Sequence, residues 1–194
     1  NSDVIIEKEF ITELKSTLDE NQNVALAGPL VYKGTPEGKN EIQNFDLSAN
    51  FKKGITIFLN LDTPEHKLPE KTKTEVVAGC AFICKIAALA EDNLFCEDNF
   101  MYGDELDLAY RLKRRGLDFM VTKKAKVWHN HDWSKENIKG KRIQYYYMPR
   151  NRFLFFRRYR LFKELLANFL KELLLLPLKI RWAMKNKDIG LVKV

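Results

Sequence analysis

Carboxylates and histidines are the residues of this chain whose types and spacing could do chemistry. Segment 101–116 has the pattern of an amphipathic helix, and its first turn carries Asp104, Glu105 and Asp107. Further along, a short apolar stretch ends in His129 and His131. Acidic side chains at a helix start, followed by a strand and a His-x-His, could act on a metal-bound phosphate ester. One carboxylate would be the base, and a histidine would help to hold the metal.

The same acidic residues also have a purely structural explanation. Carboxylates in a first helical turn stabilise the partial positive charge at that end of the helix. The leucines of the segment mark one apolar face, and its basic residues mark the solvated face. Asp107 is expected to serve the helix rather than a reaction. A site at Asp104 and Glu105 therefore depends on which other residues the fold brings to them.

The elements that must position these residues alternate along the chain. Helical spacing is expected at 8–18 and 104–115, a short helix at 85–90, and strands at 23–32, 54–61, 75–84, 117–121 and 125–128. Gly28-Pro29 is expected to break the first strand, and 33–44 and 62–73 are expected to be exposed loops. This alternation favours an α/β domain in which helices flank a sheet.

Charge divides the chain unequally. The 194 residues carry a net charge of +7, yet residues 135–194 hold 16 of the 33 Lys and Arg and only 4 of the 26 Asp and Glu. Such a basic segment favours an anionic partner: phospholipid headgroups, nucleic acid or a phosphate-bearing substrate. Leu161–Leu176 is leucine-rich, and Pro177 is expected to end it. The scattered charges argue against a membrane-spanning helix and favour an amphipathic C-terminal extension that packs on the domain or lies on a membrane.

The cysteines indicate the compartment. Cys80, Cys84 and Cys96 show no paired spacing, which argues against a disulfide framework and a structural zinc site. The cysteines therefore fit a reducing compartment, and together with the basic amphipathic segment they lead us to expect a cytoplasmic protein with a peripheral contact to the inner face of the cell membrane.

Four motifs occur in order along the chain. They are Asn1-Ser2-Asp3-Val4, Val77-Ala-Gly-Cys-Ala-Phe82, Tyr102-Gly-Asp-Glu-Leu-Asp-Leu108, and Val127-Trp-His-Asn-His131 followed by Tyr146-Tyr-Met-Pro-Arg-Asn151. Their order resembles the second half of an inverting glycosyltransferase of family two with the GT-A fold, most of all the bacterial rhamnosyltransferase-like enzymes. The resemblance implies a partial GT-A domain over 1–153, with a Rossmann-like mixed sheet flanked by helices. It also implies a basic amphipathic helical tail over 154–194 and the absence of the family's N-terminal nucleotide-binding part.

The resemblance further implies a reaction. A sugar would pass with inversion from a nucleotide-sugar donor to a hydroxyl of a glycan or lipid-linked acceptor, in cell-surface polysaccharide biosynthesis. Glu105 would be the catalytic base, and Asp104 beside it would orient the acceptor or a loop. A divalent cation, Mg²⁺ or Mn²⁺, would neutralise the donor diphosphate, with Asp3 and His129 as its protein ligands. The donor and its diphosphate would be contacted by Asp3, Gly79 and Arg150.

Alternatives remain open at this stage. Asp3 could cap the helix that follows it, His129 could pack in the core, and His131 could be the metal ligand instead. A non-catalytic module could bind an anionic membrane or nucleic acid through 141–193, and the leucine-rich face of 161–176 favours a membrane over nucleic acid. A metal-dependent phosphoesterase would use Asp104, Asp107, His129 and His131.

Overall fold

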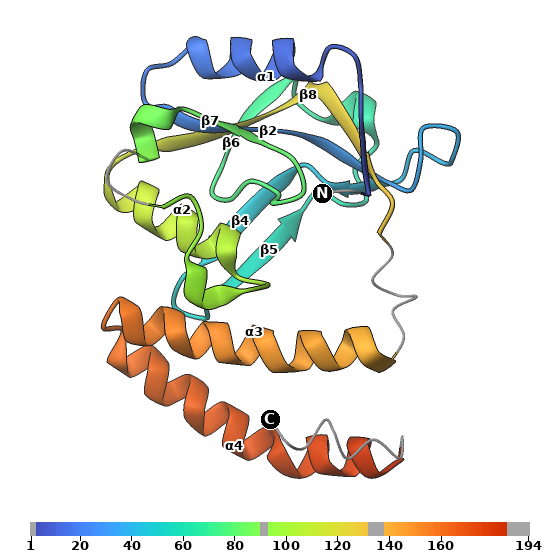
Figure 1. Ribbon diagram of the computed structural model, residues 1–194. Coiled ribbons are helices and arrows are strands. Elements are labelled where there is room, and N and C mark those ends of the chain that lie inside the picture. The colour runs from blue at the N-terminus through green and yellow to red at the C-terminus, as the bar shows by residue number, and fades with distance from the viewer. Residues whose placement is uncertain (1–2, 90–92, 132–137, 186–194) are drawn as a thin grey trace.

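The chain folds into layers that are stacked along one direction (Figure 1). The computed structural model describes residues 3–89, 93–131 and 138–185. Helix α1 (Phe10–Asp19) covers one face of a sheet, and α2 (Asp104–Arg114) and α3 (Ile138–Arg158) lie on the opposite side. Helix α4 (Phe162–Lys185) lies beyond α3. This arrangement confirms the expected α/β class, with a mixed sheet flanked by helices.

Two long strands form the centre of the sheet, which has the order β1-β8-β2-β3. Strands β2 (Val24–Lys33) and β8 (Asp118–His129) run parallel to each other. On its other side β8 pairs with β1 (Val4–Ile6) and β6 (Lys71–Thr74), both antiparallel. On its other side β2 pairs with β3 (Ile42–Asn44) and β7 (Ile83–Cys84), also antiparallel. Each long strand is therefore paired along both edges.

A separate antiparallel hairpin lies between this sheet and α3. It consists of β4 (Asp46–Asn50) and β5 (Ile55–Leu59). Its turn contains Gly54 with a φ of 61°, and a Cβ there would lie 2.7 Å from Arg152 Cγ and 3.1 Å from Phe156 Cζ. Glycine at this position thus allows α3 to pack directly on the turn. In the described ranges, three short 3-10 helices complete the elements: η1 (Glu65–Lys67), η2 (Ile86–Leu89) and η3 (Glu97–Asn99).

The core explains why the predicted helices form. Strand β2 is buried along nearly its whole length, as expected for a strand covered on both faces. On one face, Phe10, Leu14 and Leu18 of α1 recur at helical spacing and pack in one buried cluster with β2 and β8. On the other face, the apolar side of α2, with Leu108 and Leu112, packs with a second cluster. The helices expected at 8–18 and 104–115 are confirmed.

Several expected element boundaries were wrong. Strand β2 continues through Gly28-Pro29, where its pairing with β8 shifts register instead of ending. The two strand pieces expected at 117–121 and 125–128 are one strand, β8. The apolar run 75–84 is a strand only at its end, because its first residues bury their side chains from an irregular backbone. The expected loops 33–44 and 62–73 contain β3 and most of β6.

The C-terminal part consists of two helices joined at Tyr159–Leu161, where Arg160 has a φ of 56°. Pro177 lies inside α4, so the expectation that it ends the helix was wrong. It is exposed, and water can therefore hydrogen-bond the carbonyl that proline leaves without a donor. The division predicted at 153/154 falls within α3 and stays a prediction. Within the described residues, no helix combines the length and the apolar character needed to cross a membrane. Residues 186–194 of the predicted tail, like Asn1 and Ser2, lie outside the described part.

Candidate active site

A cavity of about 860 Å³ opens where the end of β8, the start of α2 and the inner side of α3 meet. Six residues predicted from the sequence line it: Asp3, Gly79, Asp104, Glu105, His129 and His131. A neighbouring cavity of about 960 Å³ shares Gly79, Glu105 and both histidines with it. The two cavities therefore form one continuous cleft beside the sheet.

The pairing of β1 with β8 brings Asp3 to the histidines. Val4 is paired with His129, and the Asn130 backbone N–H donates to the Asp3 carbonyl oxygen at 2.8 Å. Asp3 Oδ2 then lies 3.4 Å from His129 Nε2 and 3.8 Å from His131 Nδ1. The two imidazole rings stack with centroids 5.7 Å apart. The register between β1 and β8 therefore brings Asp3, near the start of the sequence, next to two histidines far along it.

The environment of His129 favours its neutral form. Its side chain is buried, and burial lowers its pKa, although nearby Asp3 opposes that shift. His129 Nδ1 lies 3.1 Å from Gln43 Oε1, which can only accept, so Nδ1 carries the proton. Nε2 then faces the Asp3 carboxylate across 3.4 Å, where a proton or a cation can lie between the two groups. A cation between them would satisfy both, and metal-bound histidines commonly donate their other N–H in this way.

These residues fit part of a metal site rather than a whole one. No group of three or more His, Cys, Asp or Glu side chains is arranged to hold a metal ion in the part of the chain that is described. Asp3 and His129 offer one oxygen and one nitrogen donor, and His131 lies beside them. Mg²⁺ and similar ions often take only one or two protein ligands and complete their coordination with phosphate oxygens and water. The pair is therefore compatible with a cation that arrives with a diphosphate.

Glu105 is held at the cleft by a glycine. Its carboxylate accepts a hydrogen bond from the Gly79 backbone N–H. A Cβ at position 79 would lie 2.8 Å from Glu105 Cδ and 2.9 Å from Cγ, closer than real Cβ contacts come. Burial raises the pKa of Glu105, and Asp104 adds to this, whereas the hydrogen bonds from backbone N–H groups oppose it. A carboxylate with a raised pKa in a cleft is suited to general-base catalysis.

Asp104 lies beside Glu105 and is the first residue of α2. Its carboxylate accepts a hydrogen bond from the Asn99 side chain. Burial raises the pKa of Asp104, and Asp107 adds to the rise, whereas the Asn99 hydrogen bond and Arg158 oppose it. Asp104 is thus tied to the loop before the helix, which agrees with a positioning role.

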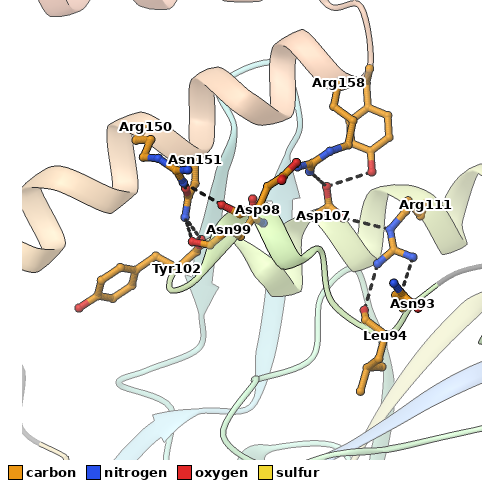
Figure 2. Close-up of polar contacts among 11 residues, drawn as sticks. Asn93, Leu94, Asp98, Asn99, Tyr102, Asp107, Arg111, Arg150, Asn151 and Arg158 are labelled. Atoms are coloured by element: carbon orange, nitrogen blue, oxygen red, sulfur yellow. Dashed lines mark hydrogen bonds and ion pairs between the residues drawn. The ribbon is translucent and has the colours of Figure 1, made fainter.

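Asn151 on α3 holds that loop in an unusual backbone conformation (Figure 2). Its Nδ2 donates to three carbonyl oxygens: Asn99 at 2.8 Å, Met101 at 2.6 Å and Tyr102 at 2.8 Å. Phe100 and Tyr102 have φ values of 55° and 68°, which non-glycine residues rarely adopt. Asn151 was part of a quoted motif, but sequence reasoning gave it no role. Its amide fixes the loop from which α2 starts, and so it fixes Asp104 and Glu105.

Asp107 ties α2 to the end of α3 (Figure 2). It is buried and accepts from Arg111 Nε at 3.0 Å, Arg158 Nη1 at 2.6 Å and the Tyr159 hydroxyl at 2.9 Å. Asp107 does not line the cleft that Asp104 and the histidines share. The structure therefore does not assemble the four residues of the phosphoesterase alternative into one site.

Arg150 is placed apart from the other predicted residues. Its Nη1 donates to the Asp98 carbonyl oxygen at 2.8 Å and to Asn151 Oδ1 at 2.7 Å, and it lines a groove between α3 and α4 (Figure 2). Arg152, which the sequence did not single out, lines the cleft instead. Burial lowers the pKa of Arg152, and Glu172 opposes that shift. Spacing along α3 alone gave no signal as to which arginine faces inward.

Comparisons with known proteins add little to this geometry. The sequence matches no protein-family model and no curated protein. Among solved structures, one match is the crystal structure of GalNAc-T7 with UDP, GalNAc and Mn²⁺, at a TM-score of 0.49 and 12% sequence identity. The match covers 66% of this chain and 26% of that one. The chemistry of this chain therefore has to follow from its own side chains.

Proposed function

We propose that this chain supplies the base and the metal-binding side of the active site of an inverting glycosyltransferase. The enzyme would move a sugar from a nucleotide-sugar donor to a hydroxyl of a glycan or lipid-linked acceptor, in cell-surface polysaccharide biosynthesis. One observation carries the proposal: Glu105, Asp3 and His129 line the same cleft. The order of the sequence motifs supports the choice of a sugar donor.

Glu105 would take the proton of the acceptor hydroxyl. As that proton leaves, the acceptor oxygen bonds to the anomeric carbon, and the bond from this carbon to the diphosphate breaks on the opposite face. A raised pKa makes the Glu105 carboxylate a stronger base than an exposed glutamate. The Gly79 N–H keeps the carboxylate in one orientation, which lowers the entropic cost of reaching a productive geometry.

Asp3 and His129 would bind the leaving side. When a divalent cation is bound, it neutralises the negative charge that develops on the diphosphate. His129 would present Nε2, because Gln43 occupies its Nδ1. Arg152 adds a positive charge from the α3 side of the cleft.

Calorimetric titration tests this proposal. UDP, dTDP and GDP are titrated into the chain with and without Mn²⁺, beside Asp3→Ala and His129→Ala. We expect at least one nucleotide to bind only with Mn²⁺, and both variants to lose that binding. Asp19→Ala, at an exposed ion pair on α1, is the matched control and should bind like the unmodified chain. Metal-dependent binding that survives in Asp3→Ala would overturn the assignment, and so would the absence of any nucleotide binding.

A further inference from the structure

Helix α4 presents a continuous apolar stripe on the outside of the molecule. Phe162, Leu166, Phe169 and Leu173 recur at helical spacing and are all exposed. Further exposed leucines lie beside these four residues, among them Leu170, Leu174 and Leu178, and the stripe ends at Met184. Leu174 is 78% exposed and Met184 is 72% exposed, although both are large apolar side chains. An apolar face of this length, left in water, marks an interaction surface.

The exposed charges of α4 all have one sign. The exposed charged residues of α4 are Lys163, Lys171, Arg181 and Lys185. The acidic residues of the helix, Glu164 and Glu172, are partly buried. Glu172 is paired with Lys179 at 2.5 Å and lies 3.9 Å from Arg152, so its charge is turned towards α3 and is neutralised there. The outer surface of α4 therefore carries an apolar stripe with exposed cations beside it and no exposed acidic residue.

This pattern selects among the possible occupants. A second copy of the chain, related by two-fold symmetry, would set cationic flanks opposite each other with no exposed acidic residue of α4 to pair them. Nucleic acid would pair the cations but leave the leucines in water. A bilayer with anionic headgroups matches both features, because it takes an apolar face into its acyl boundary and attracts flanking Lys and Arg. We propose that α4 binds flat to an anionic lipid surface through this stripe.

The lipid contact would also place the cleft close to the membrane, an inference that rests on the proposed glycosyltransferase function. Helix α3 lies between α4 and the rest of the fold (Figure 1). Its inner side lines the cleft with Ile143, Met148 and Asn151, and its outer side packs on α4. Packed helices lie about 8–10 Å apart, so the cleft would stand roughly one helix layer above the bilayer. An acceptor anchored in that leaflet could reach Glu105 without leaving the membrane.

Vesicle co-sedimentation tests the lipid contact. The chain is mixed with vesicles of pure phosphatidylcholine, or of phosphatidylcholine with about a third phosphatidylserine. We expect binding to the anionic vesicles, weakened by raising the salt from about 0.1 M to about 0.5 M. Lys171→Gln combined with Arg181→Gln should weaken binding about 25-fold, at about fivefold per cation. Leu174→Gln combined with Met184→Gln should weaken it at least tenfold, since both side chains would leave the acyl boundary.

Two control variants separate lipid binding by α4 from other effects of substitution. Ile86 is 83% exposed but lies on η2, away from α4, so Ile86→Gln should bind vesicles like the unmodified chain. Glu105→Gln should also bind normally, which separates lipid binding from failure of the proposed reaction. Equal binding to neutral vesicles, or unchanged binding by both α4 double variants, would overturn the proposal. If the chain forms a dimer in the absence of lipid, and Leu174→Gln combined with Met184→Gln makes it monomeric, the stripe binds a second copy and the lipid proposal is overturned.

Discussion

Adding one methyl group at position 79 should disable Glu105 while leaving the fold intact. In Gly79→Ala the new Cβ would lie 2.8 Å from Glu105 Cδ and 2.9 Å from Cγ. Ordinary contacts of a Cβ begin near 3.4 Å, and the carboxylate oxygen Oε1 of Glu105 would be closer still than Cδ and Cγ, so the carboxylate must move by about 1 Å or rotate away. Displacements of about 1 Å can cost about 100-fold in rate, and loss of a general base costs about 100- to 10,000-fold. We expect kcat/KM for sugar transfer to fall at least about 100-fold.

Stability distinguishes this effect from general damage. Glu105 borders an open cleft and can swing into it, so the overpacking cost should be at the low end, about 1 kcal/mol. This corresponds to a melting temperature lowered by roughly 2–4 °C. Gly28→Ala is the control, because the same methyl group there meets only Val121 and Val77, at 3.3 Å and 3.4 Å. It should lower the melting temperature but keep transfer near the unmodified rate. A Gly79→Ala protein with unchanged kcat/KM would refute the reasoning.

Three further predictions concern the same elements. Because burial raises the pKa of Glu105, ionisation of its carboxyl group lowers the free energy of unfolding. The contribution of the protonated group is complete below pH about 4 and is lost as the pH rises through the raised pKa. Thermal melts should therefore show Glu105→Gln to be more stable than the unmodified chain at pH about 8 and equal to it below pH about 4. Asp107→Ala should cost about 3 kcal/mol in urea unfolding, because it removes the buried carboxylate that pairs with Arg111 and Arg158, although both keep other partners. Asp19→Ala in the exposed pair with Lys15 should cost less than about 0.5 kcal/mol. Asn151→Leu removes the three hydrogen bonds to the loop and the one accepted from Arg150, and it should cost about 1–3 kcal/mol. Limited proteolysis should then cut more readily between residues 99 and 103; an unchanged cleavage rate would contradict the clamp.

Elements with a strong apolar period could be predicted from the sequence. Helices α1 and α2 each show one apolar face over several turns, and each buries that face against the sheet. Strand β6, by contrast, consists of Lys and Thr only and has no apolar alternation. It is a strand because β8 offers it a free edge, and this depends on tertiary pairing. The strand break expected at Gly28-Pro29 was wrong for the same reason, since pairing with β8 overrides the local tendency to turn.

The candidate site was predictable only in part. The resemblance placed Asp3, Glu105 and His129 together, and strand register accounts for the contact between Asp3 and His129. The clamp by Asn151 left no trace in the sequence, because one amide binds carbonyl oxygens about 50 residues away. Which of Arg150 and Arg152 faces the cleft depends on how α3 rotates about its axis as it packs against Gly54.

The parallel pairing of β2 with β8 constrains how this chain is made. Val24 is paired with Asp118, so the centre of the sheet closes only after nearly everything between them has been synthesised. At about 5–20 residues per second, β2 would wait roughly 5–20 s on the ribosome without its main partner. During that time an almost wholly apolar strand stays exposed, and contacts this distant in sequence form slowly. The nascent chain should therefore depend on chaperones, and truncation before β8 should leave no folded remnant of the sheet.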